Sequence, residues 1–330
     1  MKITYRQTFL HTSAASAAWA AWAAWAAWAG VLAALGLLVP AAGHAVTMLS
    51  FVHQSTAGNV SGSFTEIDHP QLNDRPDVRV FVTQAWNAAL GYGSSNPRAV
   101  APRYDVDFSG QGRWSIFNQD FTAMAVGLAF HVVVTDETAP SFIHLTHEDN
   151  TTGIGSTVAC PPEFETTCFG ATPELLHGHT LDAWGFRGAR FLVPTSMLYS
   201  SPNLYLRAES SSFSDMILGA LFWVLVGDEL ADGDWTFRHT ATAATIVHRT
   251  TRLDDPRLNA EPGAVLLVSR AGPVGPALDE HIGVFYTSEN DRWMVFHQGP
   301  TPMGEGERFV VLVAPLFTDG FESGGLSWWQ

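Results

Sequence analysis

The feature that most constrains the fold of this 330-residue chain is internal repetition. The segment that begins Phe51-Val-His53 aligns with the one that begins Phe237-Arg-His239 at a shift of 186 residues. After a seven-residue deletion, Arg113-Trp114 aligns with Arg292-Trp293 at a shift of 179. A third, more eroded segment begins Phe142-Ile-His144. Chance does not readily place such blocks in the same order, so we expect three diverged copies of one unit.

All three copies close on the string Met-x-x-Gly-x-x-Phe-x-Val-x-Val, which begins at Met124, Met216 and Met303. The copies therefore span about 50–136, 141–229 and 236–315. The middle copy has lost the Arg-Trp signature and has acquired two cysteines. We divide the chain into a signal peptide 1–45, β repeats 46–136, 137–229 and 230–315, and a C-terminal tail 316–330.

Each copy has the pattern of short strands separated by turns. Runs of β-branched and apolar residues at 78–83 and 265–269, and the alternating Phe-x-Val-x-Val string, favour strands, and long amphipathic helices are absent. We predict an all-β fold of three tandem diverged antiparallel β-sandwich or barrel-like repeats of about 90 residues, each with five or six strands. Trp114 and Phe117 point to opposite faces of one strand, which predicts that the copies pack against one another.

The N-terminus has the pattern of an export signal. Lys2 and Arg6 precede an apolar stretch from about residue 14 to 39, and Gly43-His44-Ala45 suits a signal peptidase. We expect cleavage after Ala45 and a secreted, cell-surface or periplasmic protein. The alternative is an uncleaved anchor, because the Ala-Ala-Trp iteration lengthens the apolar stretch. No later segment is apolar for long enough to cross a bilayer, so no stable membrane insertion is expected after signal removal.

The mature chain is strongly acidic. Without residues 1–45 it carries 15 basic and 32 acidic residues, a formal charge of −17, and every remaining basic residue is Arg. Such a surface repels phosphate backbones, so nucleic acid is not expected as a partner. The charge keeps an exported protein soluble, or alternatively serves divalent-cation binding.

Cys160 and Cys168 are the only cysteines, with seven residues between them. In an exported chain they predict a disulfide that closes a short loop and contributes roughly 2–3 kcal/mol on the chain-entropy model. The alternative is a metal half-site, for which no matching histidine spacing is present.

The shared order of Phe-x-His, Ile/Leu-Asp-x-Pro-x-Leu-Asn, Arg-Trp-x-Ile/Val-Phe-x-Gln and Met-x-x-Gly-x-x-Phe-x-Val-x-Val resembles an uncharacterised group of secreted bacterial tandem-repeat domains. This resemblance implies export and modularity, and it implies no particular chemistry. The end of the chain, with Asp319-Gly-Phe-Glu-Ser-Gly324, looks like a short tail found on many exported proteobacterial proteins. Its role is either that of a recognition tag or none.

Histidines repeat with the copies. If the copies pack with pseudo-threefold symmetry, His53, His144 and His239 would approach one axis, where three imidazoles can hold zinc. The alternative is that each histidine is buried and hydrogen-bonds an aspartate of its own unit, such as Asp68 or Asp254.

Other metal-binding fragments are weaker. His177-Gly-His179 is a second metal fragment or a solvated loop, and no third ligand is indicated. Asp105-x-Asp107 and Asp254-Asp255 could bind calcium, but neither shows a complete calcium loop. No cofactor is expected, with zinc and calcium as the alternatives.

Tryptophans offer a glycan-binding alternative. Trp86 and Trp184 lie beside turn-like segments and are the candidates for exposed stacking platforms, whereas Trp114 and Trp293 recur in a strand of their copies and are expected in the core.

The sequence contains no Gly-x-Ser-x-Gly, His-Glu-x-x-His or phosphate-binding loop motif, and no catalytic residue is assigned. We expect a non-enzymatic exported module for binding, adhesion or surface structure, with a glycan or surface partner. The alternatives are a hydrolase acting on polysaccharide and a protein that binds metal through the repeated histidines. An enzyme would concentrate unusual polar residues in one copy or one cleft, and the middle copy is where such a site could lie.

Overall fold

The computed structural model describes residues 48–106, 111–170, 173–183, 186–187, 189, 191–200, 203–209, 215–230, 235–272 and 279–314. The predicted signal peptide and C-terminal tail lie outside these residues. The described part is mostly strand, with one four-residue helix, α1 (Glu165–Cys168), and two 3-10 turns, η1 (Pro162–Phe164) and η2 (Gly227–Glu229). None of its helices is long and apolar enough to span a membrane. The all-β prediction is confirmed.

The first copy contains seven strands in two sheets. The strands are β1 (Met48–Gln54), β2 (Val60–Ser61), β3 (Phe64–Ile67), β4 (Arg79–Asn87), β5 (Val100–Val106), β6 (Gly112–Asn118) and β7 (Ala129–Thr135). Three of them pair antiparallel in the order β1-β7-β4, which is one part of a larger sheet, and the other four form a separate sheet in the order β2-β3-β6-β5.

The second and third copies repeat this arrangement. The second copy has β8 (Ser141–Leu145), β9 (Thr151–Thr152), β10 (Gly155–Thr157), β11 (Leu175–Thr180), β14 (Thr195–Ser200), β15 (Asn203–Ala208) and β16 (Leu221–Val226), plus a small hairpin of β12 (Asp182–Ala183) and β13 (Phe186–Arg187). The third has β17 (Thr236–Thr240), β18 (Ile246–Val247), β19 (Thr250–Arg252), β20 (Val265–Ala271), β21 (Ile282–Thr287), β22 (Arg292–His297) and β23 (Arg308–Ala314).

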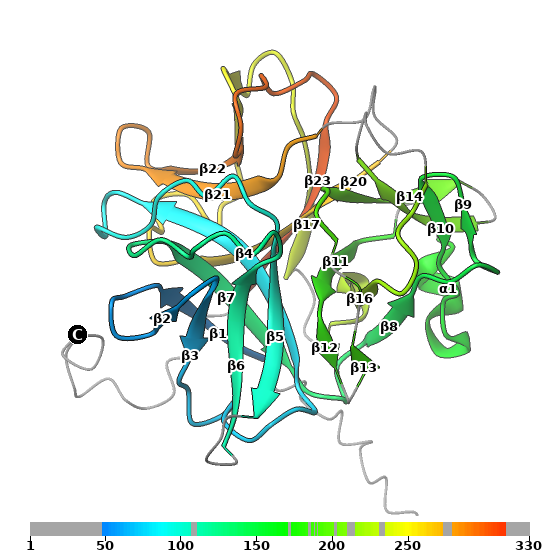
Figure 1. Ribbon diagram of the computed structural model, residues 1–330. Helices are drawn as coiled ribbons and strands as arrows, with labels where there is room; N and C mark the ends of the chain where they lie inside the picture. Colours follow the sequence, from blue (N-terminus) through cyan, green and yellow to red (C-terminus); the bar gives the residue numbers. More distant parts are fainter. Residues whose placement is uncertain are drawn as a thin grey trace, which may run out of the picture. The chain divides into compact units, whose positions relative to one another are not determined.

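In these copies the corresponding three-stranded sets are β8-β16-β11 and β17-β23-β20, and the four-stranded sets are β9-β10-β15-β14 and β18-β19-β22-β21 (Figure 1). The set β1-β7-β4 continues through β21 into one seven-stranded sheet, and β17-β23-β20 continues through β14 into another. We refer to each set as the three-stranded or four-stranded sheet of its copy. Seven strands per copy corrects the expected five or six. The additional strands, such as β2 and β9, are only two residues long, which is too short for a period-two pattern to be detected in the sequence.

The two sheets of each copy enclose its hydrophobic core. In the first copy, Trp114 and Ile116 of the four-stranded sheet pack in one buried cluster with Phe130 and Val132 of the three-stranded sheet. Trp293 and Phe309 occupy the same places in the third copy, and Leu204 takes the place of the tryptophan in the second. Trp114 and Trp293 have no exposed surface, as expected for core residues.

The repeated glycine forms the turn before the closing strand. Gly127, Gly219 and Gly306 have φ values of 89°, 79° and 86°, a region that side chains with a Cβ rarely adopt. In each turn the glycine N–H donates to the carbonyl of Ser55, Thr146 or Ala241, two residues after the repeated histidine. The Met-x-x-Gly string therefore fixes the same turn three times.

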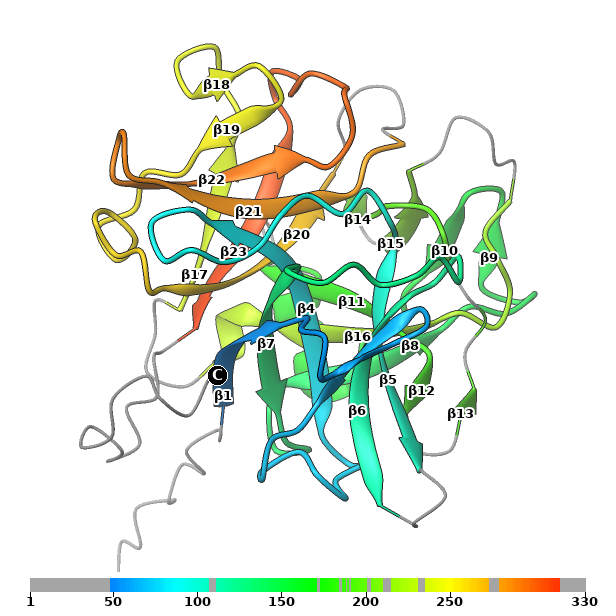
Figure 2. The same cartoon turned by 60° about the vertical axis from the view of Figure 1, so that its left-hand side comes forward.

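The copies contact one another in a cyclic order. Strand β4 of the first copy pairs in parallel with β21 of the third, and β20 of the third pairs in parallel with β14 of the second. The cycle closes at β11 of the second copy and β5 of the first, where the N–H of Leu181 donates to the carbonyl of Pro102. Figure 2 shows β4 beside β21 and β20 beside β14. We refer to these three places as the 1–3, 3–2 and 2–1 junctions.

The three-stranded sheets share a second core. Phe81 of β4, Leu176 of β11 and Leu267 of β20 belong to one buried cluster that draws side chains from all three copies. Each three-stranded sheet therefore has both faces covered, one by its own four-stranded sheet and the other by its counterparts. This arrangement explains why apolar residues occur on both faces of these strands.

Candidate functional site

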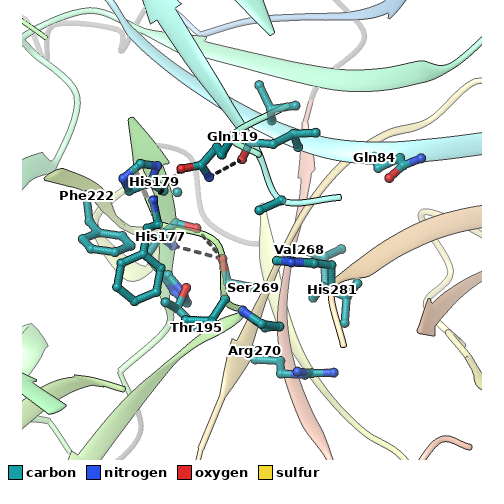
Figure 3. A pocket seen from close by; sticks show the side chains of 18 of the residues that line it. Gln84, Gln119, His177, His179, Thr195, Phe222, Val268, Ser269, Arg270 and His281 are labelled. Carbon is teal, nitrogen blue, oxygen red and sulfur yellow. Dashed lines mark hydrogen bonds between the residues drawn. The ribbon is translucent and has the colours of Figure 1, made fainter. Parts of the chain in front are cut away.

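A cavity of about 130 Å³ lies where the three copies meet (Figure 3). Its walls come from β4 of the first copy, β11 of the second and β20 of the third, together with the segments that lead into β5, β14 and β21. We call it the axial cavity, because β4, β11 and β20 are the equivalent strands of the three copies. One site is therefore assembled from all the repeats.

Equivalent positions in the wall carry different residues. Gln84, His179 and Arg270 each pair with the repeated phenylalanine of the closing strand, opposite Phe130, Phe222 and Phe309 respectively. They are thus the same position of the repeat, filled by an amide, an imidazole and a guanidinium. Two residues earlier along the same strands, Val82, His177 and Val268 are likewise equivalent.

Hydroxyl groups at the strand position between these two sets of residues connect the copies. The Oγ1 of Thr83 accepts a hydrogen bond from the N–H of Val268 at 3.1 Å, and the Oγ of Ser269 accepts one from the N–H of His177 at 3.0 Å. Ser269 also donates to the carbonyl of His177 at 3.1 Å. The third equivalent position is Gly178, which has no hydroxyl. These bonds hold β4, β11 and β20 in register around the cavity.

Two imidazoles of the wall each have one ring nitrogen without a hydrogen-bond partner among the described residues. The Nε2 of His179 donates to the carbonyl of Ala189 at 2.9 Å, which leaves Nδ1 as a bare acceptor. The Nε2 of His177 bonds the Oγ1 of Thr195 at 2.8 Å, and its Nδ1 has no partner among the described residues. Burial lowers the pKa of both histidines to about 4, so both are neutral at pH 7.

The charged residues that line the cavity are Arg98, Arg270 and Glu280, and Arg270 is the most deeply buried of the three. Burial lowers the pKa of the Arg270 guanidinium, whereas the carboxylates of Glu307, Glu209 and Glu280 oppose that shift electrostatically. Its Nε lies 3.8 Å from Oε2 of Glu307. Three carboxylates surround Arg270, and Arg98 pairs with Asp120 at 3.0 Å. Both cations are therefore compensated, and the cavity does not present the net positive charge that an anion requires.

The wall therefore offers donors and acceptors without a dominant charge. A bare imidazole nitrogen and a hydroxyl accept, and amide and guanidinium groups donate. The volume is below the usual range for drug-sized ligands, roughly 300–1,000 Å³, and exceeds the roughly 30 Å³ that one liquid water occupies. This combination suits a small, neutral molecule with several hydroxyl groups.

The three repeated histidines do not converge. The Nε2 atoms of His53, His144 and His239 bond hydroxyls of their own copies: Thr65 at 2.9 Å, Ser156 at 2.9 Å and Thr251 at 2.7 Å. They lie on β1, β8 and β17, the strands of the three-stranded sheets farthest from β4, β11 and β20. Within the described residues no three His, Cys, Asp or Glu side chains gather in a way that could hold a metal.

The partner expected for these histidines is corrected as well. Asp68 and Asp254 accept instead from the amides of Asn73 and Asn259 and face Arg113 and Arg292 at 3.9 and 3.8 Å. The histidine's hydroxyl partner lies twelve residues downstream in every copy. Each hydroxyl in turn donates to an oxygen six residues before it: Asn59, Asn150 and Thr245. This chain of bonds is a structural element of the repeat.

Of the two tryptophans predicted as platforms for glycan stacking, one lies within the described residues. Trp86 is 38% exposed, and its ring lies 5.8 Å from that of Phe285 across the 1–3 junction. Trp184 lies outside the described residues. Trp86 therefore has the exposure that a stacking platform needs, but part of its surface serves the contact between two copies.

The remaining candidates are accounted for locally. Cys160 and Cys168 form the predicted disulfide, with their Cα atoms 6.4 Å apart. Asp105 is paired with Arg103, and Asp255 with Arg257 at 2.8 Å. Asp107 lies outside the described residues.

The interpretation of His177-Gly-His179 as a solvated loop is wrong. These residues form the middle of β11, and His177 is only 8% exposed. Sequence reasoning therefore missed the axial cavity. The signal that could have found it is alignment with the other copies: Leu175-Leu176-His177-Gly178-His179 occupies the place of Val80–Gln84, a strand that the first copy shows clearly.

Comparison with known families identifies the chain as a member of the family described as Domain of unknown function (DUF7452), which matches residues 41–106, 103–162 and 196–313. The second matched segment joins the end of the first copy to the start of the second. No curated protein and no solved structure matches this chain. Three tandem matches to one family agree with the repeat found in the sequence, and they assign no chemistry.

Proposed function

We propose that this protein is an exported, non-enzymatic binding module that holds a small, neutral, hydroxyl-rich molecule in the axial cavity. Such a ligand is a free polyol or the terminal sugar unit of a glycan. The single observation that carries the proposal is the difference among Gln84, His179 and Arg270, which are equivalent in the repeat and face one cavity.

Polar residues that differ between the copies and gather in one cavity indicate a binding site rather than a structural role. Residues that only maintain a repeat keep their type from copy to copy, as the histidine and glycine of each copy do. The axial positions change type, and the second copy contributes two histidines where the first has Val82 and Gln84. Divergence of polar residues around a shared cavity is what selection for a ligand would produce.

Hydrogen-bonding capacity supports a hydroxyl ligand. The Nδ1 atom of His179 needs a donor, and a buried acceptor without one is destabilising by about 1–3 kcal/mol. A ligand hydroxyl can donate to it and accept from a neighbouring amide or guanidinium at the same time. Ordered water could meet the same need, and the experiment below separates these cases.

A hydrolase is the second candidate, and one contact favours it. His177 Nε2 lies 2.8 Å from Thr195 Oγ1, the arrangement of a base beside a hydroxyl nucleophile. In this arrangement a carboxylate would orient the base through Nδ1, and among the described residues none bonds that atom. The pair therefore supports binding better than it supports covalent catalysis.

The test uses residues 46–330, purified from an exporting host. Glycerol, glucose, galactose and N-acetylglucosamine are titrated by calorimetry, with acetate and ethylammonium as charged probes. We expect at least one neutral probe to bind and the charged probes not to bind. The variant His179→Phe removes the acceptor but keeps an aromatic ring beside Phe191 and Phe222, and it should abolish binding.

The matched control is His147→Phe, since His147 is exposed and lies on the turn after β8. It should bind the same probe with unchanged affinity. The proposal fails if no neutral probe binds the folded protein, or if His179→Phe binds as well as the parent. Release of product from a chromogenic glycoside, lost in Thr195→Val, would instead establish the hydrolase.

A further inference from the structure

The 3–2 junction contains an apolar cavity of about 140 Å³, separate in character from the axial one. Leu175, Met197 and Leu204 of the second copy and Val310 of the third form its interior. An adjoining hollow of about 190 Å³ shares Arg238, Ala271 and Arg308 with it. The two together form an apolar space with arginines at its opening, which we call the junction cavity.

The junction cavity exists because large side chains of the 1–3 junction are replaced here. At the 1–3 junction the ring of Trp293 packs on that of His131, with centroids 5.2 Å apart. The equivalent residues at the 3–2 junction are Leu204 and Val310, which follow from the pairing of the same strands. Both are smaller, and both line the cavity. Aromatic volume has therefore been lost on both sides of this junction.

A second replacement keeps the cavity open toward the surface. Trp86 and Phe285 face each other at the 1–3 junction, and their equivalents at the 3–2 junction are Gly272 and Leu198. A Cβ on Gly272 would collide with the side chain of Leu198. This close approach explains the glycine, and the indole that Trp86 provides at the 1–3 junction is absent here.

The arginines are also specific to the third copy. Arg238 is equivalent to Val52 and Ile143, and Arg308 is equivalent to Ala129 and Leu221. Arg238 pairs with Val310, and Thr240 pairs with Arg308, so the two arginines are diagonal neighbours on the same face of β17 and β23. Two apolar positions have thus become cationic beside the cavity.

The charge of these arginines is incompletely compensated. Arg238 bonds the carbonyl of Pro173 and lies 3.8 Å from Glu174. Arg308 is exposed, and no carboxylate of the described residues lies within 4.0 Å of it. Glu209 and Glu307 line a neighbouring hollow together with Arg308, but neither carboxylate lies within ion-pair distance of its guanidinium.

We infer that the junction cavity binds an organic monocarboxylate with a short unbranched apolar chain. The carboxylate would pair with Arg308, whose fork of donors matches its geometry, with Arg238 adjacent. The chain would occupy the space between Leu204 and Val310, where it removes apolar surface from water. This site is independent of the axial cavity and of its proposed ligand.

The test titrates butanoate, hexanoate and octanoate into residues 46–330 by calorimetry. Hexan-1-ol and hexylamine are the neutral and cationic counterparts of hexanoate. We expect hexanoate to bind at least tenfold more tightly than either counterpart, and more tightly than butanoate. Arg308→Leu should weaken hexanoate at least tenfold, whereas Arg252→Leu, which removes an exposed arginine of β19, should leave its affinity unchanged.

A second variant tests the apolar half of the site. Leu204→Trp restores the residue found at the equivalent positions 114 and 293, so it should fill the cavity and abolish hexanoate binding with the fold retained. Circular dichroism and the melting temperature check folding, and Arg308→Leu remains informative if Leu204→Trp does not fold. The inference is overturned if hexanoate does not bind, if hexan-1-ol binds equally well, or if Arg308→Leu binds hexanoate as the parent does. His179→Phe should not affect hexanoate, which separates this result from that of the axial cavity.

Discussion

Gln298 donates a hydrogen bond from Nε2 to Oε1 of Gln84 at 2.7 Å, across the 1–3 junction. Both amides are buried. The equivalent pair at the 3–2 junction is Glu209 and Arg270, and at the 2–1 junction it is Gln119 and His179. At the 3–2 junction the amide pair is thus replaced by a cation and an anion, and the carboxylate of Glu209 opposes the lowering of the pKa of Arg270 by burial. At the 2–1 junction Gln119 instead accepts from the N–H of Phe191 and donates to the carbonyl of Val100.

A double-mutant cycle tests the coupling between Arg270 and Glu209. Arg270→Gln should destabilise the protein by about 3 kcal/mol, because Glu209 and Glu307 then lose a buried cation. Adding Glu209→Gln should recover about 1–2 kcal/mol by recreating the amide pair of the 1–3 junction. Urea unfolding followed by tryptophan fluorescence measures both values. Glu163→Gln, an exposed change, is the control and should recover nothing in the Arg270→Gln background.

Because the same histidine–hydroxyl pair occurs in each copy, removal of the hydroxyl should lower the free energy of unfolding by a similar amount in each. Thr65→Val and Thr251→Val keep the side-chain shape but leave the buried Nε2 atoms of His53 and His239 without their hydroxyl partner. Each change should cost about 1–3 kcal/mol in free energy of unfolding, measured with urea. Thr157→Val, at an exposed strand position, should change it by less than about 0.5 kcal/mol. A negligible cost at residue 65 or 251 would show that the network does not stabilise the unit.

The repeat itself could be predicted because its residues serve local needs. Gly127 and its equivalents fix a turn that requires positive φ, and Trp114 and Trp293 fill a core, so these residue types persist in the copies that need them. The two cysteines are close in sequence, which predicts their bond without knowledge of the fold. All these features depend on neighbours within one copy.

The axial and junction cavities could not be predicted in the same way, because they depend on how copies meet. His177 and His179 show no strand pattern of their own, and only their position between Phe142 and Met216 in the second copy assigns them to β11. The hydrogen-bond partner of His53 was misassigned for a related reason. Asp68 is the more polar choice, but the strand pairing brings Thr65 to the imidazole.

Buried histidines predict an acid-sensitive fold. Burial lowers the pKa of His53, His144 and His239 to about 4, below the ordinary value of 6.5. The unfolded chain therefore binds more protons than the folded one between pH 6.5 and 4, so stability is fully present above pH 6.5 and decreases as the pH falls through this window. Each of these histidines contributes up to about 3 kcal/mol to that decrease.

Urea unfolding at pH 7.5, 6.0 and 5.0 measures this dependence, and we expect the free energy of unfolding to fall at each step. Carboxylates with a lowered pKa, such as that of Asp255, act below pH 4 and do not contribute in this range. Replacing one imidazole by an amide in His144→Gln should reduce the slope. The same substitution at exposed His147 should not. A free energy that is constant from pH 7.5 to 5.0 would contradict the burial of these imidazoles.

The closing turn predicts the same conformational cost in all three copies. A Cβ at Gly127 or Gly306 would meet no atom within 4 Å, and at Gly219 it would make an ordinary contact of 3.7 Å with Ala189. Replacement by alanine should therefore cost only the free energy of holding a Cβ-bearing residue at positive φ, about 1–2 kcal/mol in each copy. Gly58→Ala, at a glycine without positive φ, is the control and should cost less than about 0.5 kcal/mol. Three similar values would show that the repeated string is retained for backbone geometry, whereas a cost confined to one copy would show that its glycine serves a contact particular to that copy.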